Sequence, residues 1–285
     1  MPNVFEIIKT VILGIVEGIT EWLPISSTGH MILVDEFIKL KARTEFMDIF
    51  FVVIQLGAIL AVVILFWGKL WPFCLSKQKR TEGKTFVDVD KILLWVKILI
   101  ASVPAAIVGL LFDDEIDSML TGDMRAFVVA GALIVYGILF IIIENLKKKE
   151  TLTDLNKMPY AKALYIGLIQ CLSLVPGTSR SGSTILGASL LGASRTVAAE
   201  FSFFLGIPAM FGASAIKLLK FFADGLVFTK EEIIILVTGC AVSFAVSIFA
   251  IKFLVSYIKK HDFKAFGIYR IILGIAVILY FVIAK

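Results

Sequence analysis

The stretch that decides the fold is Pro176-Gly-Thr-Ser-Arg-Ser-Gly-Ser-Thr184, which lies within a mostly apolar run at about 161–193. Its proline and glycine interrupt a helix that arrives from Tyr165, and a new helix can begin near Ser179. The arginine is unusual there, because an ionisable side chain inside a membrane costs on the order of 3 kcal/mol and marks a functional site. Free N–H groups at a helix start and a guanidinium together favour a phosphate. The alternative is a proline kink, with hydroxyls that cap freed backbone groups and Arg180 extended to the membrane surface.

The composition indicates a membrane protein that crosses the bilayer several times. The chain has 285 residues, of which 59% are hydrophobic, and a mean hydropathy of +0.96, whereas soluble domains are about half apolar. Its apolar runs are continuous and lack the alternation of a membrane β-barrel. Six runs approach the roughly 20 residues that a spanning helix requires. They lie at about 46–67, 92–112, 125–146, 196–220, 232–256 and 267–284. We therefore expect an all-α polytopic protein with a single membrane domain over residues 1–285.

Charge and cysteine usage exclude several other classes of protein. The formal net charge of +5 lies mostly in loops, which is typical of membrane topology and not of nucleic-acid binding. The cysteines Cys74, Cys171 and Cys240 have no paired spacing, so we expect neither disulfides nor a metal cluster. The first apolar run continues into Glu17 and Glu21 without a small-residue cleavage site, which argues against a cleaved signal peptide.

Two interrupted stretches, at about 4–33 and 161–193, share features in the same order. The matching segments are Leu13–Glu17 with Ile166–Gln170, Pro24–His30 with Pro176–Ser183, and Arg125-Ala-Phe127 with Lys264-Ala-Phe266. Each interrupted stretch is followed by three of the expected spans. The sequence therefore predicts two repeats, residues 1–146 and 161–285.

Loop charges orient these repeats in the membrane. Lysine and arginine concentrate in the loops at about 68–91, 147–162 and 257–266, whereas the loop at about 113–124 is acidic. The positive-inside rule places the three basic loops in the cytoplasm, so both termini lie outside and neither interrupted stretch crosses the membrane. Both should be re-entrant helical hairpins that enter from opposite faces and meet near the midplane, as in inverted-repeat proteins. The alternative is that each is an ordinary kinked span.

The first interrupted stretch carries a second group of reactive side chains. Glu17 and Glu21 are four residues apart and share one helix face. These carboxylates could bind a divalent cation together with a phosphate, act as a general base, or pair with Arg180. Ser27 and His30 are three residues apart and can also share a face, and histidine suits proton transfer near neutral pH.

Two motifs carry a resemblance to a known family. They are Glu17-Gly-Ile-Thr-Glu-Trp-Leu-Pro-Ile-Ser-Ser-Thr-Gly-His30 and Pro176-Gly-Thr-Ser-Arg-Ser-Gly-Ser-Thr184. With their order and the six spans, they resemble the bacterial undecaprenyl-diphosphate phosphatase family of the bacitracin-resistance type. The resemblance implies an inner-membrane enzyme that hydrolyses undecaprenyl diphosphate to undecaprenyl phosphate and inorganic phosphate. That reaction recycles the lipid carrier of cell-wall synthesis. The resemblance also implies a pocket open to the outer face and dependence on Mg²⁺ or Ca²⁺.

The resemblance assigns roles to particular residues. The expected catalytic residues are Glu17, Glu21, Ser27, His30 and Arg180. The expected diphosphate-binding residues are Ser26, Gly177, Ser179, Arg180, Ser181 and Thr184. Glu17 and Glu21 are the candidate metal ligands, Ser26 could equally be a helix cap, and the nucleophile is Ser27, His30 or a water molecule.

The expected partners are a polyprenyl diphosphate and membrane lipid, with no nucleic acid; a homodimer is compatible with the sequence. An alternative interpretation of the same residues is a transporter or flippase for a lipid phosphate, because transporters also have inverted repeats with broken helices.

Overall fold

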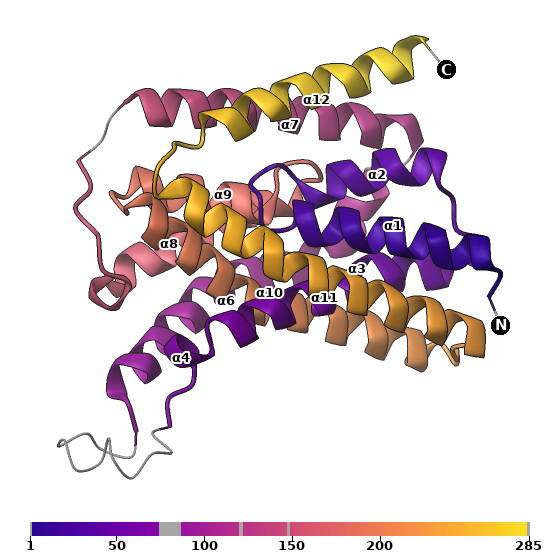
Figure 1. Ribbon diagram of the computed structural model, residues 1–285, viewed down its shortest axis with the longest axis horizontal. Helices are drawn as coiled ribbons and strands as arrows, with labels where there is room; N and C mark the ends of the chain where they lie inside the picture. The colour runs from indigo at the N-terminus through magenta and orange to yellow at the C-terminus, as the bar shows by residue number, and fades with distance from the viewer. Residues whose placement is uncertain (1, 74–86, 120–121, 147–148, 284–285) are drawn as a thin grey trace.

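The computed structural model describes residues 2–73, 87–119, 122–146 and 149–283, and helices account for most of them (Figure 1). The longer helices, in chain order, are α1 (Val4–Thr20), α2 (Ser27–Phe37), α3 (Thr44–Leu65), α6 (Val89–Met119), α7 (Gly122–Asn145), α8 (Tyr160–Gln170), α9 (Arg180–Leu190), α10 (Arg195–Ala223), α11 (Lys230–Ile258) and α12 (Lys264–Ile283). Short helical turns are α4 (Trp67–Leu70), η1 (Leu155–Lys157) and η2 (Cys171–Leu174). Among these described residues the β-structure consists of isolated bridges, which confirms the all-α prediction.

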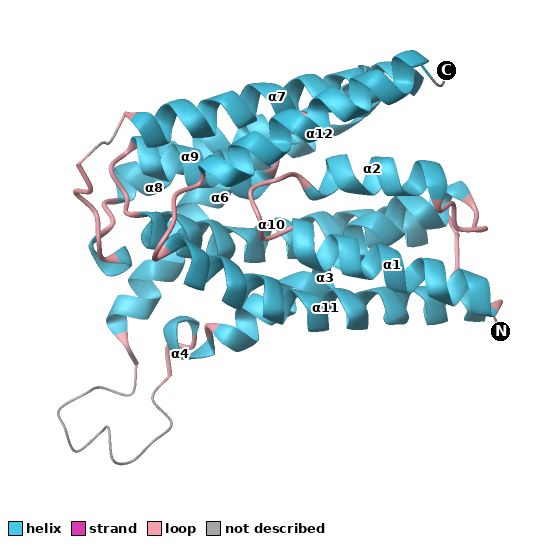
Figure 2. Ribbon diagram, turned by 45° about the horizontal axis from the view of Figure 1, so that its top comes forward, coloured by secondary structure: helices cyan, strands magenta, loops and turns pink. Residues whose placement is uncertain are grey.

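Six of the helices are long and apolar enough to cross a membrane: α3, α6 over Val89–Phe112, α7 over Met124–Asn145, α10, α11 and α12. They correspond to the six apolar runs of the sequence. The α7 and α12 helices lie side by side along one edge of the bundle (Figure 2). The interrupted stretches form the shorter pairs α1–α2 and α8–α9, which lie between the spans.

The two helical pairs turn in the same way. Ser26 precedes α2 with φ 74°, and Ser179 precedes α9 with φ 71°. Each serine is a helix N-cap, and its side chain accepts a hydrogen bond from the backbone N–H three residues later, Gly29 and Gly182 respectively. A positive φ is uncommon outside glycine and costs on the order of 1–3 kcal/mol. The same strained geometry at corresponding positions supports the two predicted repeats, which stay a prediction.

Two local predictions are wrong. The residues at about 113–124 do not form a loop throughout, because α6 continues to Met119 and α7 begins at Gly122; no proline or glycine occurs in residues 113–119 to end the helix. In the second interrupted stretch, α8 ends at Gln170 and tightens into η2, ahead of Pro176. Val175 is extended, as expected of a residue before proline. Most of the basic loop at 68–91, and Cys74, lie outside the described residues.

Glycines bring the helices of the two halves into close contact. Helix α1 packs on α11 through Gly14 and Gly18, and α8 packs on α6 through Gly167. A Cβ atom at Gly57 of α3 would overlap the carbonyl oxygen of Cys240 in α11. Such backbone-to-backbone approach is the usual role of small residues between membrane helices.

The close approach at Gly57 predicts a large effect of one methyl group. Gly57→Ala should separate α3 from α11 and lower the free energy of unfolding by about 1–3 kcal/mol, the usual cost of overpacking. Thermal unfolding in detergent measures the change. Gly131→Ala is the matched control, because a Cβ at Gly131 of α7 would meet nothing within 4 Å. Equal unfolding temperatures for the two variants would contradict the assigned packing.

Candidate active site

The two hairpins meet at the guanidinium of Arg180, the first residue of α9. Its Nη2 donates to Glu21 Oε1 at 2.8 Å, and its Nη1 donates to the carbonyl oxygen of Ser202 in α10 at 2.7 Å. The Arg180 and Glu21 side chains are only 12% and 8% exposed, so water screens this ion pair weakly. Of the three roles open to the carboxylates, pairing with Arg180 is realised by Glu21.

The second oxygen of Glu21 accepts from a hydroxyl. Ser27 Oγ donates to Glu21 Oε2 at 2.6 Å, and both residues are buried. Glu21 therefore links Arg180, from the second hairpin, to Ser27, from the first. A hydroxyl bonded to a carboxylate that a third group holds in place is the arrangement of an activated nucleophile.

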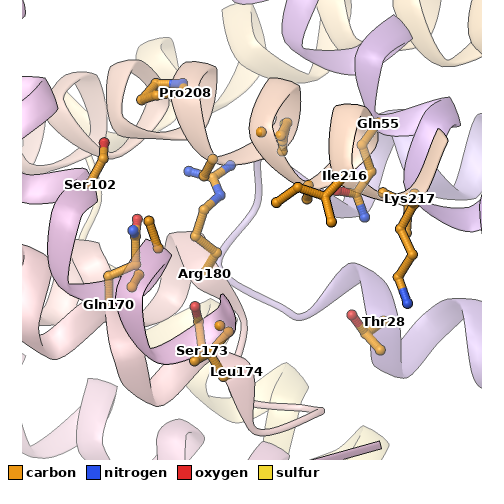
Figure 3. Close-up of a pocket in the computed structure, with 18 of the residues that line it drawn as sticks. Thr28, Gln55, Ser102, Gln170, Ser173, Leu174, Arg180, Pro208, Ile216 and Lys217 are labelled. Carbon is orange, nitrogen blue, oxygen red and sulfur yellow. The ribbon is translucent and has the colours of Figure 1, made fainter. Parts of the chain in front are cut away.

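A cavity of about 770 Å³ opens beside these groups. Its polar lining includes Glu21, Ser27, Thr28, Gln170, Ser179 and Arg180, and the backbone of Gly177 also reaches it. Figure 3 shows Arg180 in the middle of the space, with Gln170 and Ser102 on one side of it and Thr28 and Lys217 on the other. The predicted residues Glu21, Ser27, Gly177, Ser179 and Arg180 thus share one cavity.

The other predicted hydroxyls lie behind this surface. Thr184 Oγ1 is 2.7 Å from Ser202 Oγ, and Ser181 Oγ donates to the carbonyl oxygen of Glu21 at 3.2 Å. Both side chains are buried, as is Ser26, whose hydroxyl caps α2. These three residues are not among those that line the cavity. In this geometry they hold Arg180, Glu21 and the turn in place.

Glu17 lies one helical turn before Glu21 and is 1% exposed. Its Oε1 has no hydrogen-bond partner. A buried carboxylate oxygen without a partner is costly, and a proton or a cation would compensate it. Within the described ranges no three histidine, cysteine or acidic residues gather closely enough to hold a metal ion. Glu17 and Glu21 remain the candidate carboxylate ligands for a cation.

Comparison with known proteins identifies the family. The model of the family described as Bacitracin resistance protein BacA matches residues 10–276. The chain belongs to this family. An Undecaprenyl-diphosphatase of Enterococcus faecalis is 59% identical over 276 residues, which are 96% of each chain. The Undecaprenyl-diphosphatase of Acetivibrio thermocellus is 56% identical, over 98% of this chain and 99% of its own. Together with its six apolar helices, membership makes this BacA-family chain a multi-pass inner-membrane protein.

His30 lies apart from the Glu21–Ser27 pair. Its Nδ1 is 2.7 Å from the carbonyl oxygen of Ser26, and its Nε2 is 2.6 Å from the hydroxyl of Tyr269 in α12. A carbonyl can only accept, so Nδ1 carries the proton, and Nε2 of the neutral ring accepts from the tyrosine. His30 does not line the cavity. A shared helix face with Ser27 did not bring the two side chains together, because the Ser26 carbonyl and Tyr269 engage the ring.

Arg270 of α12 supports the site from behind, and the sequence analysis did not single it out. It is fully buried and donates to the carbonyl oxygens of Pro24 at 3.1 Å, Gly177 at 2.8 Å and Thr178 at 3.0 Å. Its guanidinium also lies 5.3 Å from the centre of the Tyr136 ring. One side chain thus joins the turns of both hairpins in this BacA-family fold. The signal was available, because an arginine inside the apolar run at 267–284 is as unusual as Arg180.

Gln170 is a second missed residue. It is 2% exposed, lines the cavity, and its Oε1 has no hydrogen-bond partner. The repeat comparison aligned it with Glu17, and this correspondence could have singled it out. Two buried side chains with unpartnered oxygens therefore stand at matching positions of the two hairpins.

Because Arg270 bonds to both turns, we predict that a positive charge alone, without the guanidinium group, does not stabilise the fold fully. In Arg270→Lys, a single ammonium cannot reach the carbonyls of both turns. Charge-assisted hydrogen bonds contribute about 1.5–3 kcal/mol each, so loss of two should lower the unfolding free energy by at least about 3 kcal/mol. Denaturant unfolding in detergent checks this. The control is Arg125→Lys, whose side chain is exposed; a wild-type midpoint for Arg270→Lys would show that the turns are held by other contacts.

Proposed function

We propose that this protein hydrolyses undecaprenyl diphosphate to undecaprenyl phosphate and inorganic phosphate, and so recycles the lipid carrier of cell-wall synthesis and confers bacitracin resistance. The observation that carries the proposal is the chain of contacts from Arg180 through Glu21 to Ser27 at the wall of one cavity. It combines a cation for a phosphate with a hydroxyl beside a carboxylate. The names of the close relatives support the same reaction.

The diphosphate binds against Arg180 and the start of α9. The guanidinium and the backbone N–H groups of a helix N-terminus stabilise negative charge on the transferring phosphoryl group. Ser179 and Gly177 complete this wall of the cavity. Because Arg180 already bonds to Glu21, the incoming phosphate shares the guanidinium with that carboxylate.

Two routes of attack fit the contacts. In the first, Glu21 takes the proton of Ser27, and Ser27 Oγ attacks the terminal phosphorus. The bond from this phosphorus to the bridging oxygen breaks, undecaprenyl phosphate leaves, and water then hydrolyses the phosphoserine. In the second, Glu21 takes a proton from water, which attacks the same phosphorus directly. His30 either receives a proton in one of these steps or holds the Ser26 turn through its bonds to Ser26 and Tyr269.

A divalent cation, Mg²⁺ or Ca²⁺, completes the proposal. Glu17 and Glu21 would hold it, and the unpartnered Oε1 of Glu17 is the observation that fits it. When bound, such an ion neutralises charge on the phosphate oxygens. Hard cations of this kind prefer oxygen ligands, and carboxylates supply them here.

We also propose that the cavity opens to the outer face and that both termini lie outside. The basic loops support this orientation. Figure 1 shows both termini at one end of the bundle, the end that also holds the α10–α11 connection. A transporter of lipid phosphates would need the same anion site, but it has no need of a hydroxyl bonded to Glu21, so the hydrolase is the better reading.

Two variants test the role of Arg180 in hydrolysis. Arg180→Lys keeps the charge but loses the planar fork. Gly206→Ala leaves Arg180 in the sequence but places a Cβ about 2.8 Å from its Cζ and Nη1, which forces the guanidinium away from Glu21. Both should lower phosphate release by about 10²-fold or more, the scale of a lost transition-state donor. The assay uses purified protein and undecaprenyl diphosphate. Wild-type turnover in a folded Arg180→Lys variant would remove Arg180 from the mechanism, and the absence of release by the wild type would favour the transporter.

Ser27→Ala, His30→Ala and the double variant separate the routes of attack. If Ser27 is the nucleophile, Glu21 takes its proton and His30 receives a proton in the same route, then each single loss should be severe and the double variant little worse, because residues that act as a unit are non-additive. If water attacks, Ser27→Ala should retain substantial turnover. Trapping of phosphoserine in rapid-quench experiments distinguishes the routes independently. Full activity of both single variants would exclude Ser27 as the nucleophile and His30 as a proton acceptor, and would leave the water route through Glu21.

The orientation has its own test. A cysteine at Lys260, between α11 and α12, should react with a membrane-impermeant thiol reagent only after the cytoplasmic face is opened. A cysteine at Asp224, between α10 and α11, should react in intact cells. Both positions are exposed, so reactivity reports the side of the membrane. The reverse labelling pattern would overturn the proposed orientation and place the cavity opening on the cytoplasmic side.

A further inference from the structure

The cavity is larger and more apolar than a diphosphate requires. Its volume of about 770 Å³ is typical of sites for drug-sized ligands, which range over roughly 300–1,000 Å³. A diphosphate alone is much smaller than such ligands. Arg180, Ser179 and Gly177 line one part of it, and Lys217 and Lys220 at the far end of α10 line another. The remaining wall comes largely from two spanning helices, α6 and α10.

Small residues dominate where these two helices line the cavity. They are Ala105, Ala106 and Gly109 of α6, and Ala209, Gly212 and Ala213 of α10, which we call the slot. The spacing within each trio is one and three to four residues, so each trio lies on one helix face. Larger apolar side chains continue the wall beyond the slot, among them Leu110 and Ile216, which are 66% and 43% exposed.

The glycines of the slot do not serve helix packing. A Cβ at Gly212 would meet nothing within 4 Å, and one at Gly109 would meet only Leu174 Cδ2 at 3.8 Å. Gly57 and Gly167 differ, because a Cβ at either would overlap the backbone of a neighbouring helix. Glycine in a helix interior costs about 1 kcal/mol relative to alanine. The slot glycines therefore leave space that no other part of the described chain fills.

Two polar atoms beside the cavity are buried without a partner in the protein. The Oε1 of Gln170 and the Nε of Arg180 are buried without hydrogen-bond partners, and Gln170 is 2% exposed. Buried polar atoms are rarely left unpaired in folded proteins. Figure 3 shows the Gln170 and Arg180 side chains in the space that Pro208 and Ile216 of α10 also line. The ligand is therefore polar where it meets these two side chains.

One face of α10 joins the polar part of the cavity to the slot. Ser202 accepts from Arg180, and Gly206 makes room for its guanidinium. The same face continues three to four residues at a time through Ala209 and Ala213 to Ile216. From Gly206 to Ala213 is about 10 Å along the helix. A ligand that has a phosphate at Arg180 would thus extend along an apolar surface between α6 and α10.

We propose that the slot binds the isoprenoid units nearest the diphosphate, so that the lipid chain leaves the active site between α6 and α10. This assignment rests on the proposed hydrolysis of undecaprenyl diphosphate. Apolar space next to a phosphate site suits a chain of methyl-branched isoprenoid units, which gains free energy by burial of its apolar surface. Because both helices span the membrane, the chain passes from the slot into lipid.

Thiol protection tests occupancy without relying on turnover. Gly212→Cys introduces a side chain into open space of the slot, and Gly131→Cys is the matched control in α7, where a Cβ also meets nothing within 4 Å. Alkylation of the peptide that carries each new cysteine is followed by mass spectrometry. Undecaprenyl phosphate should slow alkylation at position 212 at least about fivefold and leave position 131 unchanged, and inorganic phosphate should slow neither.

Protection absent at position 212, or equal at both positions, would overturn the proposal. The proposal would also be overturned if, without lipid, the cysteine at position 212 reacted slowly and its alkylation became faster when the protein was diluted. That result would show that a second copy of the chain occupies the slot. Phosphate release by the wild type is measured in parallel. If undecaprenyl phosphate protects position 212 but the wild type releases no phosphate, the proposed hydrolysis is wrong and the slot stands. If the wild type releases phosphate but position 212 is not protected, the slot is wrong and the hydrolysis stands.

Kinetics with substrates of two lengths test the consequence for catalysis. Gly212→Leu should raise the KM for undecaprenyl diphosphate at least about tenfold with a small change in kcat, because the leucine fills the slot. The same variant should process inorganic diphosphate, which has no isoprenoid unit, at the wild-type rate, and Gly131→Leu should affect neither substrate. An equal loss on both substrates, or none on the longer one, would contradict the assignment. If the wild type does not process the short substrate, the comparison of the two leucine variants on the long substrate decides.

Discussion

A helix that breaks inside a membrane exposes carbonyl groups that no water satisfies, and each unsatisfied group costs several kcal/mol. This chain breaks its helices twice, before α2 and before α9, and both breaks bring carbonyls to one buried side chain. Arg270 donates to Pro24 on one turn and to Gly177 and Thr178 on the other. The cation is itself costly to bury, and carbonyl dipoles and the Tyr136 ring compensate it. The hairpins and their arginine therefore depend on each other.

The second buried arginine is held differently, and the difference suits its role. Arg180 pairs with a carboxylate, and its Nε has no partner. A buried ion pair recovers its desolvation cost only when the remaining donors are satisfied. Arg180 thus keeps a donor for a ligand, whereas Arg270 bonds to the protein through all three of its nitrogens. Two residues of the same type, both within apolar runs, serve binding in one case and architecture in the other.

The sequence was sufficient for the features that depend on local pattern. Continuous apolar runs predicted the six spans. A helix start near Ser179 was predicted, but its capping role was not, and a cap was one of two roles left open for Ser26. The pairing of Glu21 with Arg180 was among the stated alternatives because two opposite charges in apolar surroundings have few other partners. The sequence could not predict which side chains from distant helices contact one another. His30 shares a helix face with Ser27, yet it bonds to Tyr269, which follows it by 239 residues. The helix break also came at Gln170 and not at Pro176, because tertiary packing of α8 and η2 fixes where the helix tightens.

The joint attachment of both hairpin turns to Arg270 has a mechanical consequence. Proteins that move a solute by alternating access rock one half against the other around a central site. Here, such rocking would separate Pro24 from Gly177 and strip carbonyl partners from a fully buried cation. Arg270 therefore fixes the position of one turn relative to the other at the centre of the protein. Opening of the site by separation of the two turns would therefore cost these charge-assisted hydrogen bonds.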